Sequence, residues 1–187
     1  VDSISVRDLA AQPCLQDLCV ISSRFQLTTS CHSELRISPQ LCKLEFTDAV
    51  HDLSLAVAQQ LAYCFPGLRE IILTGMAAEQ GAISALLSAL GNLKELTLGS
   101  LELSPSPEDE RAIADKGSTL KCLELANSAA IATDALVERL SLQATGLEHL
   151  SLYGSGLVTD ESMRTLSNSP CRLGLVELDL TFCTMVT

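Results

Sequence analysis

The chain has 187 residues, of which 47% are hydrophobic but only 3% aromatic, and its formal net charge is −11 at pH 7. Because phosphate groups are bound by clustered lysine and arginine, this acidic balance argues against nucleic acid as a partner, and against a membrane surface for the same reason. The sequence has no apolar run of the roughly 20 residues needed to span a bilayer, and its first ten residues do not resemble a signal peptide.

A Leu-x-x-Leu-x-Leu pattern, with Ile, Val or Phe in places, recurs along the whole chain. Successive copies start 26, 27, 25, 27, 27 and 28 residues apart, which is within the range of about 20–29 residues typical of leucine-rich repeats. The first leucines of the seven copies are Leu15, Leu41, Leu68, Leu93, Leu120, Leu147 and Leu175.

In chain order, residues 7–13 are predicted as the end of a helix that stops at Pro13. Each repeat then begins with a strand, over 15–22, 41–46, 68–73, 93–98, 120–125, 147–152 and 175–180. Residues 22–40 are irregular and are predicted as a loop. Amphipathic helices are predicted over 48–65, around Ile83–Leu90, over Glu108–Lys116, and after the Thr-Asp pairs at 133–134 and 159–160. The helix over 108–116 is weakly apolar, so we expect it to be less well packed.

These elements predict an α/β fold of about seven repeats, a right-handed leucine-rich-repeat solenoid with a parallel concave sheet and convex helices. The whole of 1–187 is expected to be a single leucine-rich-repeat domain. Thr187 lies twelve residues after Leu175, as Thr159 lies twelve after Leu147, so the sequence stops where another helix would begin. We therefore expect the chain to be a fragment of a longer repeat array.

The Thr-Asp helix openings, Cys183 at a strand turn and the Phe-Pro and Ser-Pro steps before strands resemble the cysteine-containing leucine-rich repeats, most clearly in LYGSGLVTDESMRTL and LVELDLTFCTMVT. That subfamily is known from substrate-recognition subunits of F-box ubiquitin ligases and from scaffold subunits of large assemblies. The family's Cys-Pro step is displaced here to Cys64-Phe65-Pro66 and Ser169-Pro170-Cys171, and no F-box is visible. The resemblance implies a protein-binding role.

The eight cysteines contain no C-x-x-C pair, and several fall at repeat-defined positions; Cys64 and Cys171 each lie four residues before a first leucine. Buried free cysteine behaves as a small hydrophobic residue. We therefore expect reduced, structural cysteines and an intracellular protein, cytoplasmic or nuclear.

Strand alternation places the residues two, four and six positions after each first leucine on the outer, concave face of the sheet. Seven of them are acidic and one, Lys43, is basic, although Arg69, Lys94 and Lys121 lie one residue from acids and could partly neutralise them. The candidate protein-binding residues are Asp17, Glu45, Glu70, Glu95, Glu124, His149, Tyr153, Glu177 and Asp179. Because like charges on adjacent strands are destabilising, this pattern suggests a partner with a basic surface; the alternative is a face that is merely kept solvated.

Tyr153, with His149 in the same strand, is the best candidate for an aromatic anchor, unless it simply packs on its neighbours. No phosphate-binding, dinucleotide, zinc-protease or nucleophile-elbow motif is present. Cys122 and His149 would lie on adjacent strands, but no orienting group for a catalytic pair is evident, and no metal or cofactor is expected.

The sequence thus predicts a non-catalytic protein–protein interaction scaffold, as a structural subunit of a larger hetero-oligomeric assembly. The alternative is the substrate-recognition subunit of an F-box type ubiquitin ligase.

Overall fold

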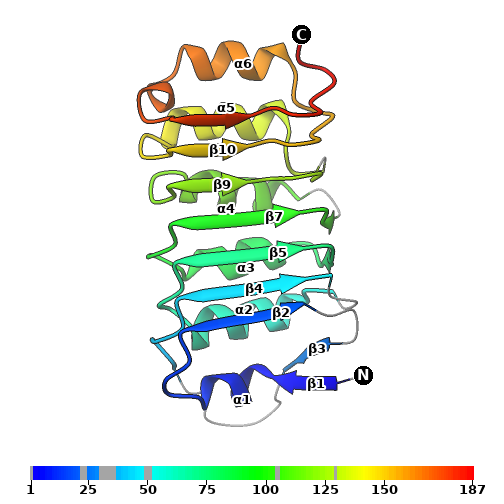
Figure 1. Ribbon diagram of the computed structural model, residues 1–187, viewed down its shortest axis with the longest axis vertical. Coiled ribbons are helices and arrows are strands. Elements are labelled where there is room, and N and C mark those ends of the chain that lie inside the picture. Colours follow the sequence, from blue (N-terminus) through cyan, green and yellow to red (C-terminus); the bar gives the residue numbers. More distant parts are fainter. Residues whose placement is uncertain (1, 22–24, 30–36, 49–51, 104–105, 129) are drawn as a thin grey trace.

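The computed structural model describes residues 2–21, 25–29, 37–48, 52–103, 106–128 and 130–187, and has a mixed α/β structure (Figure 1). Seven strands form one open sheet, parallel throughout, in which the strand order follows the chain. They are β2 (Asp17–Ile21), β4 (Lys43–Thr47), β5 (Glu70–Thr74), β7 (Glu95–Gly99), β9 (Cys122–Glu124), β10 (His149–Ser151) and β11 (Glu177–Asp179). All seven predicted strands are confirmed.

The register of this sheet follows the sequence repeat without a slip. The residue two positions after each first leucine pairs with the same position of the next strand, as Lys43 does with Glu70 and His149 with Glu177. The repeats differ in length by up to three residues, so the extra residues lie outside the strands. One row across the sheet therefore consists of Asp17, Lys43, Glu70, Glu95, Cys122, His149 and Glu177.

Strand alternation puts the leucine pattern into a core shared by all repeats. From β4 to β10 the inward side chains are at most 1% exposed, for example Leu44 and Phe46 in β4 and Leu96 and Leu98 in β7, whereas most residues between them are partly or fully exposed. Burying one such leucine or phenylalanine stabilises the fold by about 1.5–3 kcal/mol. In the outer strands the inward residues are less buried, and Leu178 in β11 is 37% exposed. The predicted direction of the alternation is confirmed.

Helices cover one face of the sheet, behind it in Figure 1, and from α2 to α6 each contacts the next. They are α1 (Val6–Ala10), α2 (Leu55–Cys64), α3 (Ala82–Ser88), α4 (Pro107–Lys116), α5 (Asp134–Gln143) and α6 (Asp160–Ser167), followed by the 3-10 helix η1 (Pro170–Leu173). The helix starts predicted at the Thr-Asp pairs are confirmed, since Thr133 and Thr159 cap α5 and α6 through their side chains.

Helix α3 has no capping side chain of its own, because its N-cap residue is Gly81. The carboxylate of Asp109, on α4, instead accepts hydrogen bonds from the amides of Gly81 (3.0 Å) and Ser84 (2.7 Å). Asp109 is only 2% exposed, and Ile113 beside it is fully buried. Helix α4 buries three of its ten residues against five of ten in α2, in keeping with the prediction that it is less well packed, and one of the buried positions is an acid with a capping role.

A left-handed turn follows six of the strands at one fixed repeat position, seven residues after the first leucine. Its φ angles lie between 48° and 68°, at Asp48, Gly75, Ser100, Asn127, Gly154 and Phe182. The first five amides donate to the equivalent turn of the next repeat, at 2.7–2.9 Å. The side chain after the turn then donates backward in three repeats, from Ser128, Ser155 and Cys183 to the carbonyls of Leu98, Leu125 and Leu152.

Two small parallel sheets lie outside the main one, β1 (Asp2–Ser5) with β3 (Phe25–Thr28) and β6 (Ala77–Ala78) with β8 (Glu102–Leu103). The loop predicted over 22–40 is thus wrong at 25–28, where FQLT alternates apolar and polar residues as a strand does; residues 22–24 and 30–36 lie outside the described residues. The helix predicted over 48–65 begins only at Leu55, because Leu53 forms a bridge with Ala78 and Ser54 caps the helix.

Candidate protein interface

The open face is the side of the main sheet that none of the described helices covers, formed by the residues two, four and six positions after each first leucine (Figure 1). All nine candidate binding residues lie on it, eight within strands and Tyr153 just after β10. The structure does not gather them into one cluster. Asp17, Glu45, Glu70 and Glu95 lie on the first four strands, and the other five surround one hollow over the last three.

On the first strands, Lys43 pairs with the acids around it. Its Nζ lies 2.5 Å from Glu70 and 3.5 Å from Glu45, on the neighbouring and the same strand, and Asp17 is its register partner on the other side. The hydrogen bond with Glu70 is the main reason that the pKa of Lys43 is raised, so the ammonium stays charged. This part of the open face is therefore partly neutralised within the chain.

The other three basic residues do not neutralise the face, contrary to expectation. Lys121 pairs with Glu148, and Lys94 donates to the carbonyl of Thr119, 3.3 Å away. Neither acceptor is on the open face, and the ion pairs of the described residues include none from Arg69. Lys94 and Lys121 therefore reach the start of the neighbouring repeat instead of the acids of the open face.

Over β9, β10 and β11 the open face contains a hollow of about 320 Å³, which we call the acidic hollow. Three of its lining residues are acids, and no lysine or arginine among the described residues lines it. It is lined by Cys122, Glu124, Ala126, His149, Leu150, Ser151, Tyr153, Glu177 and Asp179. The negative charge of the open face is thus offset least at this end of the sheet.

Uncharged groups and one histidine hold these three acids. Ser151 donates to Asp179 at 3.1 Å, Thr97 donates to Glu124 at 3.2 Å, and the Nδ1 of His149 lies 3.0 Å from Glu177. Hydrogen bonds from Thr181, and then from Ser151, lower the pKa of Asp179, so its carboxylate is ionised at neutral pH. The hollow therefore presents negative charge to whatever enters it.

An aromatic pair stands at the end of the hollow. The rings of Tyr153 and Phe182 meet edge to face, with centroids 5.2 Å apart and planes at 87°. Phe182 is 68% exposed and has φ +61°, a conformation that bulky residues rarely adopt. Sequence reasoning missed Phe182; the signal was that its repeat position is otherwise held by Asp, Gly, Ser and Asn.

Cys122 and His149 are register partners on adjacent strands, as expected, but the hydrogen bonds of the described residues join each of them to a carboxylate instead of to the other. The Nδ1 of His149 contacts Glu177, and the Cys122 thiol donates to Glu124 at 3.9 Å. Burial first, and then the charges of Glu124 and Glu95, raise the pKa of the Cys122 thiol to about 11. A nucleophilic cysteine needs a lowered pKa, so this environment disfavours the thiolate that catalysis requires.

Seven cysteines fall in the described residues and all are free thiols, with Cys64, Cys171 and Cys183 buried; Cys31 lies outside them. In the same ranges, no group of three or more His, Cys, Asp or Glu side chains is arranged to hold a metal ion. Every helix in the described part of the chain is too short or too polar to cross a membrane.

No protein-family model matches the chain, and no curated protein sequence matches it.

Proposed function

We propose that the chain is a right-handed leucine-rich-repeat solenoid that serves as a non-catalytic protein–protein interaction scaffold, a structural subunit of a larger intracellular assembly. The in-register parallel strands, each returning to the same sheet after a helix or turn, support the solenoid. The free buried cysteines are in keeping with a reducing compartment. We expect no turnover of a small molecule.

The open face carries this proposal. It presents seven acids on six of the seven strands, which are spaced about 4.8 Å apart, and two of these acids, Glu70 and Glu95, are register partners on adjacent strands. Among the described residues of the face, Lys43 is the one lysine or arginine, and it offsets part of this charge. Stacking like charges on adjacent strands lowers stability, and a surface that only needs solubility can mix both signs. A partner with complementary positive charge would relieve the repulsion and gain association rate from electrostatic steering.

The experiment is affinity purification of the protein from cells, with cross-linking and quantitative mass spectrometry, for wild type and two variants of equal charge change. One variant neutralises the acidic hollow (Glu124→Gln, Glu177→Gln, Asp179→Asn). The matched control neutralises three exposed acids on the helices (Glu108→Gln, Asp115→Asn, Glu138→Gln).

We expect a fixed, stoichiometric set of proteins that is cross-linked to the open face, kept by the control and depleted at least tenfold by the hollow variant. Equal loss in both variants, or the absence of any stoichiometric partner, would contradict the proposal. Recovery of a cullin and its adaptor would support the ubiquitin-ligase alternative in its place.

A further inference from the structure

The acidic hollow differs from the rest of the open face in having a small residue with an acid on each side. Ser151 on β10 pairs in register with Glu124 on β9 and with Asp179 on β11. The corresponding row on the earlier strands reads Cys19, Glu45, Ile72 and Thr97, so no other place on the sheet sets two acids about a small side chain. A positive group above Ser151 would have a carboxylate on either side.

The walls of the hollow suit one kind of positive group. Tyr153 follows Ser151 by two residues, lines the hollow and packs edge to face with the Phe182 ring. A guanidinium is planar, carries five donors and stacks on aromatic faces, whereas an ammonium is a compact, strongly hydrated point charge. Two carboxylates in one row, on the strands either side of β10, with an aromatic wall in the next row match the planar, several-donor group better.

We propose that the acidic hollow is an arginine-binding site: the guanidinium of a partner's arginine lies over Ser151, donates to Glu124 and Asp179, and packs against the ring of Tyr153. This inference rests on the proposed function, because it names the side chain by which a basic partner is recognised. Glu177, which contacts His149, also lines the hollow and adds negative charge to it.

The test uses small probes, so it does not require the partner to be known. The ¹H–¹⁵N spectrum of the protein is titrated with N-acetyl-arginine amide, with the lysine analogue and with N-acetyl-citrulline amide, which has the shape of arginine without its charge. We expect saturable shifts at the amides of residues 122–126, 149–153 and 177–182, with citrulline binding at least tenfold and lysine at least threefold more weakly than arginine.

Two pairs of variants connect the shifts to the proposed geometry. Ser151→Arg should fill the hollow with the chain's own guanidinium and abolish the shifts, whereas Thr47→Arg, on β4 of the same face, adds the same charge and should leave them intact. Tyr153→Ala should weaken arginine binding at least threefold, and Tyr153→Phe, which keeps the ring, should not. Unchanged dispersion of the remaining resonances shows that each variant is folded.

Equal shifts with arginine and citrulline, lysine binding as tightly as arginine, or shifts that survive Ser151→Arg would each overturn the arginine site. Suppose that one of these NMR results was obtained, but that a partner was still cross-linked to the open face and lost from the variant that neutralises the acidic hollow. The proposed function would then stand, and only the arginine site would be overturned. Arginine binding with no recoverable partner would instead support the arginine site but overturn the proposed function.

Discussion

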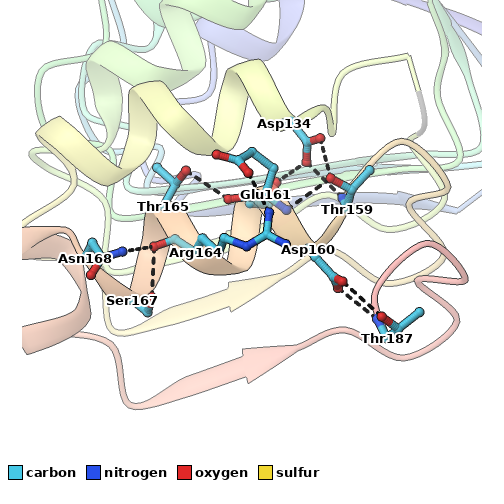
Figure 2. A network of polar contacts seen from close by, with 10 residues as sticks. Asp134, Thr159, Asp160, Glu161, Arg164, Thr165, Ser167, Asn168 and Thr187 are labelled. Atoms are coloured by element: carbon cyan, nitrogen blue, oxygen red, sulfur yellow. Dashed lines mark hydrogen bonds and ion pairs between the residues drawn. The ribbon is translucent and has the colours of Figure 1, made fainter.

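The carboxylate of Asp134, the first residue of α5, accepts hydrogen bonds from both the amide and the hydroxyl of Thr159, the residue that caps α6, at 2.9 and 2.7 Å (Figure 2). The hydroxyl of Ser162 bonds to the same carboxylate. One repeat later, Asp160 makes the same two contacts with Thr187, both at 2.9 Å. Asp134 therefore does more than open its own helix, because it also holds Thr159, the residue that caps α6.

We predict that Asp134→Ala lowers the free energy of unfolding by about 2 kcal/mol, since hydrogen bonds to a charged acceptor contribute more than neutral ones. Urea denaturation followed by circular dichroism measures the change. Glu138→Ala, an exposed position of the same helix, is the control and should shift the free energy by less than about 0.5 kcal/mol. An Asp134 variant as stable as this control would show that the link between repeats is not stabilising.

Acid should weaken this link. Burial alone would raise the pKa of Asp134, but the hydrogen bonds from Ser162 and Thr159 outweigh it and lower the pKa below the ordinary value of 3.8. A carboxyl whose pKa is lower in the folded state stabilises the fold above its unfolded-state pKa and loses that contribution as the pH falls through its folded-state pKa. The stability difference between wild type and Asp134→Asn should thus be constant above about pH 5 and shrink below pH 4. Denaturation series from pH 2.5 to 7 measure it; a difference independent of pH would contradict the assignment.

How far sequence reasoning reached depended on whether a feature repeats. The seven strands and their register were predictable because the leucine spacing fixes both which residues pair and which face each side chain occupies. β1 and β3 were not, because four-residue strands outside the repeat give too short a pattern. Asp109 illustrates another limit: it lies in an acidic run that is typical of a solvated helix start, and only the missing side chain at Gly81 hinted that α3 needs a cap from outside.

For the candidate binding residues, too, the features fixed by the repeat could be predicted and the others could not. Alternation placed all nine on the open face, but it could not tell which acids are neutralised, because that depends on how far the Lys43 side chain reaches across strands. Nor could spacing reveal the ring contact between Tyr153 and Phe182, since Phe182 lies in a turn where neither strand nor helix periodicity fixes the side-chain direction.

Gly154 should tolerate no side chain. Its φ is +68°, and an added Cβ would lie 2.1 Å from the Oδ1 of Asn127, in the equivalent turn of the preceding repeat. We predict that Gly154→Ala lowers the free energy of unfolding by about 1–2 kcal/mol, through backbone strain and displacement of Asn127. Gly156→Ala is the matched control, because nothing lies within 4 Å of its added Cβ; it should be neutral or slightly stabilising. Thermal denaturation measures the stability of both variants. If Gly154→Ala and Gly156→Ala were destabilised equally, the turn at Gly154 would have no special role.

The thiol of Cys122 should react slowly in the folded protein. With its pKa raised to about 11 from 9.0, the thiolate fraction at pH 8 falls about 100-fold. We predict that iodoacetamide modifies Cys122 at least tenfold more slowly in the native protein than in urea, as followed by peptide mass spectrometry. Glu124→Gln should speed the native reaction, since this charge contributes to the raised pKa. A native rate matching the unfolded one would reopen the catalytic interpretation of Cys122 and His149.

Removing either member of the aromatic pair should have different consequences for stability, although both changes abolish the same ring contact. An edge-to-face pair contributes about 0.5–1.5 kcal/mol, and a left-handed backbone costs a bulky residue about 1–2 kcal/mol. Phe182→Asn loses the contact but relieves the backbone at φ +61°, since asparagine tolerates this conformation. We therefore expect its free energy of unfolding to stay within about 1 kcal/mol of wild type.

Tyr153→Leu loses the contact with no such relief and should be less stable than wild type by about 1–2 kcal/mol. Urea denaturation of the two variants side by side measures the difference, with Tyr153→Phe as a control that keeps the ring. If both variants lost the same amount, the left-handed turn would impose no strain on Phe182, and its exposed ring would need no functional explanation. If Phe182→Asn alone retained stability, the phenylalanine would be a residue that this repeat keeps at a cost, next to the hollow where we place the arginine of a partner.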